Sequence, residues 1–199
     1  MKIKKLISAL VLGSMLVGLS GCNITDFSAE NLLRPPKAVG DEAEIEQLIA
    51  KTADSGYTLK YPKNGKFRSA IIMTDLDGND SNEAVAFFRN SAETSSVHML
   101  VMYSKDNSWE IASDNIFETT DIDSVDFADL TGNGKAEIIV NSTTYTPNVG
   151  KLSCYSYSEG KTNEVGSGQS CSSFVTGDFD NDGTSEIMSL VLYTTENEA

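Results

Sequence analysis

Asp75-Leu76-Asp77-Gly78-Asn79-Asp80-Ser81-Asn82-Glu83 is an acidic segment whose pattern occurs three times in this chain. The same spacing returns in Asp129-Leu130-Thr131-Gly132-Asn133-Gly134-Lys135-Ala136-Glu137 and in Asp178-Phe179-Asp180-Asn181-Asp182-Gly183-Thr184-Ser185-Glu186. In each copy, oxygen-bearing side chains stand at positions 1, 3, 5 and 9, and an apolar run follows. The copies recur at roughly 50 residues, a period typical of folds in which each repeat is one supersecondary unit.

The segments around each acidic loop have the composition of short β-strands. In the first repeat we expect strands at 69–74, 83–88, 97–103 and around 109–111, with a turn at 105–107. The second repeat has the same order at 125–129, 137–140, 151–157 and 161–165, and the third contains only 173–177 and 186–193. Four-stranded antiparallel units at about 40–50 residues are typical of β-propeller blades. The sequence therefore predicts an all-β fold over residues 57–199, a partial β-propeller of about two and a half blades.

One short helix is expected before the strands, over residues 41–56. Ile45, Leu48 and Ile49 follow helical spacing, acidic residues open the segment, Lys51 stands near its end and Gly56 follows it. Acids in the first turn and a base in the last turn suit the helix dipole, so the segment is predicted to be an amphipathic helix.

The three loops have the residue types of a calcium site. Calcium accepts about 6–8 oxygen ligands, which side chains at alternate positions of a tight turn can supply together with a main-chain carbonyl at position 7. Ordinary acidic turns are the alternative, but three copies in one register favour calcium. The predicted ligands are Asp75, Asp77, Asn79, Ser81 and Glu83; Asp129, Thr131, Asn133, Lys135 and Glu137; and Asp178, Asp180, Asp182, Thr184 and Glu186.

The loops differ in charge and in turn chemistry. The first and third loops each contain four carboxylates when Asp80 is counted, whereas the second contains two. Position 6 bends sharply and favours glycine, which Gly134 and Gly183 supply and Asp80 does not. We therefore expect the third loop to bind calcium most tightly, the first next and the second least.

Residues 67–193 resemble the FG-GAP or VCBS repeat family. An EF-hand has a twelve-residue loop between two helices, whereas strand-like residues follow each loop here. The family's blades carry such loops in integrin α-chain propellers and in many bacterial surface proteins, so the resemblance implies calcium-binding blades. Asp80 replaces the family's usual glycine, and Thr131 and Asn133 depart from its Asp-x-Asp-x-Asp/Asn frame.

The N-terminus has the features of an export signal. Three lysines precede an apolar run over 6–19, which is shorter than the roughly 20 residues that a membrane span needs. Leu19-Ser20-Gly21-Cys22 resembles a bacterial lipobox, which implies a lipoprotein signal peptide over 1–21 and lipid attachment at Cys22. An ordinary signal peptide is the alternative. Residues 22–40 contain Pro35-Pro36 and are expected to form a tether. The expected location is the extracytoplasmic face of the cell membrane.

The net charge limits the classes of binding partner that we expect, and the cysteines bear on disulfide formation. A formal net charge of −14 argues against nucleic acid, which would repel the chain. Cys154 and Cys171 would be exported with the chain, where a disulfide is permitted, but strand-like neighbours also suit two buried thiols.

Enzyme signatures are weak in this sequence. His98 is the one histidine, and its place in an apolar strand favours packing over catalysis. Trp109, Tyr145, Tyr155 and Tyr157 fit either a carbohydrate-binding face or strand packing. We therefore expect a non-enzymatic, calcium-binding surface module that binds or scaffolds carbohydrate or protein. The alternatives are a truncated cell-envelope glycan hydrolase or lyase whose catalytic residues lie in missing blades, and an accessory subunit of a larger complex.

Overall fold

The computed structural model describes residues 40–54, 56–146 and 148–192. The signal peptide predicted over 1–21, the lipid site at Cys22 and the tether up to residue 39 lie outside the described residues. The chain divides into two compact units, Met1–Lys37 and Ala38–Ala199, and every described residue belongs to the second. Within the described part, no helix combines the length and the apolar character needed to cross a membrane.

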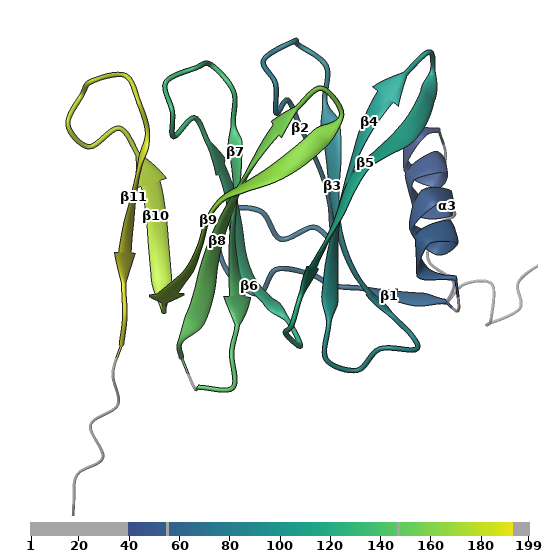
Figure 1. The fold of residues 1–199 in the computed structure, drawn as a ribbon, viewed down its shortest axis with the longest axis horizontal. Coiled ribbons are helices and arrows are strands. Elements are labelled where there is room, and N and C mark those ends of the chain that lie inside the picture. The colour runs from purple at the N-terminus through teal and green to yellow at the C-terminus, as the bar shows by residue number, and fades with distance from the viewer. Residues whose placement is uncertain (1–39, 55, 147, 193–199) are drawn as a thin grey trace, which may run out of the picture. The chain divides into compact units, whose positions relative to one another are not determined.

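The described part is mostly β-structure with one helix, α3 (Asp41–Ala53), as Figure 1 shows. Sheet A consists of β1 (Tyr57–Leu59), β2 (Ile71–Thr74), β3 (Glu83–Asn90), β4 (Val97–Lys105) and β5 (Ser108–Phe117). Sheet B consists of β6 (Ile122–Ala128), β7 (Glu137–Thr143), β8 (Gly150–Ser158) and β9 (Lys161–Cys171), and sheet C of β10 (Ser173–Gly177) and β11 (Glu186–Leu190). The prediction of an all-β fold with one short helix is confirmed.

Among residues 40–54, 56–146 and 148–192, all strand pairs are antiparallel and no sheet closes on itself. Strands β2 to β5 pair in chain order, and β1 adds to the end of β3 through Leu59 opposite Phe88. Strands β6 to β9 repeat this order in sheet B, while β10 pairs with β11 in sheet C. Each acidic loop therefore joins the first two strands of one such unit.

Two strands extend well beyond the lengths that the sequence predicts. Strand β5 reaches Phe117 and β9 reaches Cys171, although the expected segments were only 109–111 and 161–165. Both follow two-residue turns, Asp106-Asn107 and Glu159-Gly160, in which both residues have positive φ. Such turns match the twist of the strands, so pairing with the preceding strand continues despite the polar residues. Strand β11 ends at Leu190, earlier than the predicted 193.

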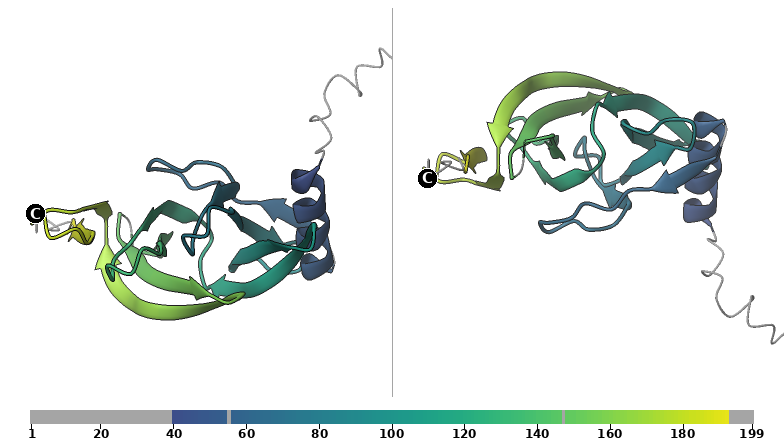
Figure 2. Two further views of the ribbon diagram at one scale, coloured as in Figure 1. Left: turned by 90° about the horizontal axis from the view of Figure 1, so that it is seen from above. Right: turned by 90° about the horizontal axis from the view of Figure 1, so that it is seen from below.

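The helix and the sheets pack as successive layers, visible in Figure 2 with α3 beside sheet A and sheet C beyond sheet B. Side chains alternate between the two faces of a strand. From β3, Ala84, Ala86 and Phe88 therefore face the helix, where Ile45 and Ile49 are buried. Val85 and Phe87 on the opposite face pack in a cluster that includes Val125, Ile138, Val140, Tyr155 and Tyr157 of sheet B. Strands β3 and β7 are therefore buried on both faces.

The two outermost layers differ in how they are covered. Sheet B packs against sheet C through Ile139, Leu152 and Cys171, with Phe174 and Ile187 beside them. The outer face of sheet C exposes Val175, Met188 and Leu190. Helix α3 covers the equivalent apolar face of sheet A, whereas no described element covers that of sheet C.

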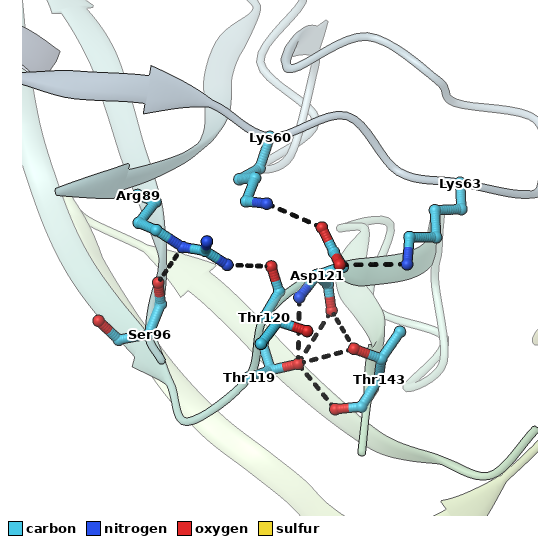
Figure 3. Close-up of polar contacts among 8 residues, drawn as sticks. All are labelled: Lys60, Lys63, Arg89, Ser96, Thr119, Thr120, Asp121 and Thr143. Atoms are coloured by element: carbon cyan, nitrogen blue, oxygen red, sulfur yellow. Dashed lines mark hydrogen bonds and ion pairs between the residues drawn. The ribbon is translucent and has the colours of Figure 1, made fainter. Parts of the chain in front are cut away.

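A polar network fixes the connection between sheets A and B, as Figure 3 shows. Asp121 Oδ1 lies 2.8 Å from Lys60 Nζ, and its Oδ2 lies 3.1 Å from Lys63 Nζ. The Thr119 hydroxyl donates to the carbonyl of Thr143 at 2.7 Å, and the Arg89 guanidinium donates to the carbonyls of Thr120 and Ser96. The segment between β5 and β6 is thereby tied to both sheets.

We expect Asp121→Asn to reduce stability at neutral pH and to flatten its loss in acid. Desolvation raises the pKa of Asp121, but Lys60 and Lys63 outweigh it and hold the pKa below its ordinary value of 3.8. A lowered folded pKa stabilises the fold above the unfolded pKa, and this contribution is lost as the pH falls through the folded value. The expected cost at pH 7 is about 1–2 kcal/mol in urea unfolding.

The matched control is Asp106→Asn, because Asp106 is an exposed turn residue with no ion pair in the described part of the chain. In stability curves measured from pH 7 to pH 2, the difference between wild type and Asp121→Asn should stay constant down to about pH 4 and shrink as the pH falls further through the folded pKa of Asp121. The same curves for Asp106→Asn serve as the reference. Parallel curves for Asp121→Asn would mean that this ion pair contributes nothing.

Candidate metal-binding loops

The three acidic loops lie side by side at one end of the sheets, as Figure 1 shows. The N–H of Ala136 in the second loop donates to the carbonyl of Leu76 in the first at 3.0 Å. The N–H of Ser185 in the third loop donates to the carbonyl of Asp129 in the second at 2.9 Å. The second and third loops are therefore each bonded at position 8 to the start of the loop before them, which brings the acidic segments of consecutive repeats together.

The aspartate at position 1 organises each loop by accepting backbone N–H groups. Asp75 accepts from Gly78 at 2.8 Å and from Asp80 at 2.9 Å. Asp129 accepts from Gly132 at 2.8 Å and from Gly134 at 2.7 Å. In the third loop Asp178 accepts from Gly183 at 3.0 Å. These bonds wrap the backbone around one carboxylate, so the residue types at position 1 are a requirement of the turn itself.

Positions 5 and 9 also play the same part in all three loops. The oxygen at position 5 accepts the N–H of position 7. The Ser81 N–H donates to Asn79 Oδ1 at 2.7 Å, and the corresponding bonds in the other two loops are 2.8 Å. The glutamate at position 9 accepts the N–H of position 2, at 2.8 Å for Glu83 and Glu137 and at 2.9 Å for Glu186. The sequence repeat is therefore a repeat of one hydrogen-bonded frame.

The backbone is left-handed at positions 4 and 6 of every loop. Asp80 has φ 64° at position 6, where Gly134 and Gly183 stand in the other loops. Position 4 has φ 74°, 72° and 62° at Gly78, Gly132 and Asn181. Position 4 was not predicted to be left-handed, although glycine or asparagine, the residues that adopt this conformation most readily, stands there in all three copies.

Two of the loops bring acidic side chains together. The ligand atoms of Asp178, Asp180, Asp182 and Glu186 all lie within 4.8 Å of one another, and so do those of Asp75, Asp77 and Glu83. Asp80, counted above among the first loop's carboxylates, is not part of its group. In the described residues the second loop forms no such group, because Asp129 and Glu137 are its only carboxylates.

One carboxylate oxygen in the first loop is buried without a hydrogen-bond partner in the described residues. Asp77 Oδ1 is buried and has no hydrogen-bond partner in the described residues. Such an atom costs on the order of 1–3 kcal/mol, and more when charged. A cation placed among Asp75, Asp77 and Glu83 would coordinate this oxygen and offset the repulsion between the three carboxylates. The donor set is entirely oxygen, which is the set that calcium and magnesium prefer.

The negative charge of the first-loop carboxylates contributes to the raised pKa values of Glu83 and Tyr157. Burial raises the pKa of Glu83, which is 3% exposed, and the charges of Asp77 and Asp75 add to this against the lowering effect of the Leu76 N–H. Burial also raises the pKa of Tyr157 to about 12, to which the charges of Glu83 and Asp77 contribute. For Asp75 desolvation acts upward, but the backbone N–H groups outweigh it and lower the pKa.

The histidine and the two cysteines considered in the sequence lie in positions that indicate a structural role. His98 is buried and stacks on Phe88 at 4.8 Å, with Nδ1 2.9 Å from Asp114 and Nε2 3.1 Å from Glu93. Cys154 and Cys171 are free thiols, and burial raises the pKa of both.

The aromatic residues considered for a carbohydrate-binding face do not form one. Trp109, Tyr155 and Tyr157 are buried in the cores between the layers. Only Tyr145 is presented to solvent, with 92% of its surface exposed. A period-two strand pattern places these residues on a face but does not say whether another layer covers that face.

No family model, no curated protein and no solved structure matches this chain. The assignment of a function therefore depends on the residues and the geometry described above.

Proposed function

We propose that this chain is a calcium-binding module of propeller-type repeats, held at the outer face of a bacterial membrane by a lipid on Cys22. The observation that carries the proposal is the hydrogen-bonded frame that the three loops share, together with the acidic groups in the first and third. In the first and third loops, ligand atoms of three and four acidic side chains lie within 4.8 Å of one another. A cation among them would offset the repulsion between these carboxylates.

In the FG-GAP or VCBS interpretation of the repeats, the sheets correspond to blades. In this proposal β2 to β5 form one blade, β6 to β9 a second, and β10 and β11 the beginning of a third. Blades pack face to face, as sheets A, B and C do through their shared apolar clusters. The exposed apolar face of sheet C would then receive a further blade, either from additional chain or from a partner.

Calcium is the cation that the loops suit best. Magnesium demands near-ideal octahedral geometry and keeps several of its waters, whereas calcium tolerates mixed carboxylate, amide and carbonyl sets. The proposed ligands in the first loop are Asp75, Asp77, Asn79, Ser81 and Glu83, and the corresponding set in the third is Asp178, Asp180, Asp182, Thr184 and Glu186. Because neighbouring loops are bonded to each other, an ion in one loop would also hold its blade against the next.

The proposed role of the ion is structural, and the proposed role of the module is binding or scaffolding at the cell surface. The buried His98, with a carboxylate against each ring nitrogen, is occupied by its packing and its two partners. The lipid anchor would hold the module beside surface glycans and proteins, while the acidic charge argues against nucleic acid.

Glu83→Gln should change stability in opposite directions with and without calcium. In chelator at pH 7 the substitution should leave the free energy of unfolding unchanged or raise it. Glutamine keeps an acceptor for the Leu76 N–H and removes a charge whose pKa is raised by burial and repulsion. In 10 mM calcium it should lower stability by about 1–3 kcal/mol, the value of one site with a dissociation constant near 10⁻⁴–10⁻³ M.

Glu137→Gln is the matched control, because Glu137 makes the same bond to Leu130 N–H at 2.8 Å in a loop without an acidic group. Urea unfolding of both variants, each with and without calcium, gives the comparison. A calcium response equal to that of wild type in Glu83→Gln would remove the first loop from the proposal.

A further inference from the structure

The tripeptide Asn-Gly-Lys occurs twice in this chain, at residues 64–66 and 133–135. An asparagine followed by glycine loses its side-chain amide more readily than other asparagines, because glycine has no side chain to shield its backbone nitrogen. That nitrogen attacks the carbonyl carbon of the asparagine side chain, and ammonia leaves. Because the two copies have the same local sequence, a large difference in their reactivity has to come from the fold.

The second copy is held by the hydrogen-bonded frame of the second acidic loop. The Gly134 N–H donates to Asp129 Oδ2 at 2.7 Å, so the attacking nitrogen is engaged with a carboxylate. The side-chain carbonyl of Asn133 is engaged as well, because its Oδ1 accepts the Lys135 N–H at 2.8 Å. The nitrogen and the carbonyl must therefore each give up a hydrogen bond before they can react.

The first copy lies in the connection between β1 and β2 and lacks both of these bonds. The Gly65 N–H has no hydrogen-bond partner among the residues that the structure describes. The Asn64 side chain is held there through its nitrogen alone, which donates to Asp123 Oδ1 at 2.9 Å, while its carbonyl oxygen accepts no hydrogen bond. The attacking nitrogen and the carbonyl under attack are thus both free at this site.

Access to solvent does not distinguish the two copies. Asn64, Gly65, Asn133 and Gly134 are all exposed, and the two glycines have similar positive φ values of 85° and 80°. Water therefore reaches both sites equally. The feature that differs is the hydrogen bonding of the groups that react.

We propose that Asn64 is a site of spontaneous deamidation and that the loop frame protects Asn133 from the same reaction. At Asn64 a bond forms between the Gly65 nitrogen and the side-chain carbon Cγ, and the bond from Cγ to Nδ2 breaks. The proton of the Gly65 N–H leaves with Nδ2, so that ammonia is released and a five-membered succinimide remains. One water molecule then opens this ring to aspartate or to isoaspartate.

The product disturbs the contact between the β1–β2 connection and sheet B. Asn64 bonds to Asp123 twice, from its N–H to the carbonyl at 2.7 Å and from its side-chain nitrogen to the carboxylate at 2.9 Å. Deamidation removes the donor of the second bond and leaves two carboxylates facing each other, which repel. Isoaspartate also adds a carbon atom to the main chain beside the first bond. The modification therefore weakens this connection, and it involves neither calcium nor the lipid anchor.

The test is a time course on the full-length chain at pH 8.5 and 37 °C in chelator, where no bound metal adds to the loop frame. Digestion with pepsin in acid, followed by mass spectrometry, measures aspartate and isoaspartate at each asparagine. In the folded chain Asn64 should react about tenfold faster than Asn133, as one additional hydrogen bond to open predicts. In concentrated urea the two asparagines should react at similar rates, because unfolding removes the frame and leaves the same tripeptide. Equal rates in the folded chain, or a faster reaction at Asn133, would overturn the proposal.

Asp129→Ala tests the protection of the second copy. The substitution removes the acceptor of the Gly134 N–H, so it should speed the reaction at Asn133 and leave the reaction at Asn64 unchanged. An unchanged rate at Asn133 would show that the frame does not protect it. If this variant does not fold, the comparison of folded and urea-unfolded wild type still decides the proposal.

Asn64→Asp reproduces one product of the reaction and tests its effect on the fold. Urea unfolding should show Asn64→Asp to be less stable than wild type, because the new carboxylate faces Asp123. The matched control is Asn163→Asp, since Asn163 is exposed on β9 and its side chain has no hydrogen bond in the described part of the chain. Equal stability of the two variants would contradict the expected weakening of the connection.

Discussion

Calcium at 10 mM should raise the free energy of unfolding by about 3–5 kcal/mol relative to chelator. The first and third loops each offer an acidic group, and two sites with dissociation constants near 10⁻⁴–10⁻³ M contribute about 1.4–2.7 kcal/mol each by mass action on the folded state. Urea unfolding of the full-length chain in the two conditions measures the difference. Magnesium at the same concentration should give a smaller increase.

Asp180→Ala and Asn133→Ala show whether the increase comes from the expected loops. Asp180 belongs to the four-carboxylate group of the third loop, whereas Asn133 stands in the loop without one. The calcium response should fall by roughly half in Asp180→Ala and stay unchanged in Asn133→Ala. The reverse result would make the predicted order of loop affinities wrong.

Gly78→Ala should cost about 2–5 kcal/mol, the largest loss expected from a single methyl group in these loops. Gly78 has φ +74°, and a Cβ there would lie 2.8 Å from the carbonyl oxygen of Gly134 in the neighbouring loop. A left-handed conformation costs alanine about 1–2 kcal/mol, and overlap with a backbone atom adds about 1–3 kcal/mol. Urea unfolding in chelator isolates this effect from metal binding.

Gly134→Ala is the matched control for this substitution. Gly134 has φ +80°, but a Cβ there would meet nothing within 4 Å. Only the conformational cost of about 1–2 kcal/mol remains. Equal losses in the two variants would show that the first and second loops are not in contact.

The sequence predicts the repeats well because the acidic loops and the strands both have short-range signatures. Helix α3 covers Asp41–Ala53, the segment in which Ile45, Leu48 and Ile49 follow helical spacing. The strands that flank the loops follow from runs such as Ala84 to Phe88, where every residue is apolar. A turn that needs a carboxylate acceptor at position 1 and left-handed residues at positions 4 and 6 has similar residue types at these positions each time it occurs.

The roles of individual loop residues were harder to predict, because they depend on the folded backbone. Position 1 was predicted as a metal ligand, but in the fold the Asp75 carboxylate also accepts the backbone N–H groups of Gly78 and Asp80. Asp80 was counted among the four carboxylates of the first loop, yet it has φ 64° and is not part of the acidic group.

Features that join distant segments have no local signal at all. Lys60 and Asp121 lie 61 residues apart and form an ion pair of 2.8 Å. The burial of Trp109 depends on α3, which covers that face of sheet A. A cavity beside Asn141 brings together Asn64, Thr120 and Asn148 from three separate connections. None of these could be read from spacing within one repeat.

Isothermal titration of the full-length chain with calcium, after removal of metals, measures directly whether the acidic loops bind the ion. We expect two saturable sites per chain in the wild type, and one fewer in Asp180→Ala. Absence of saturable binding up to 10 mM calcium would show that the acidic loops are turns only, and would contradict the proposed function.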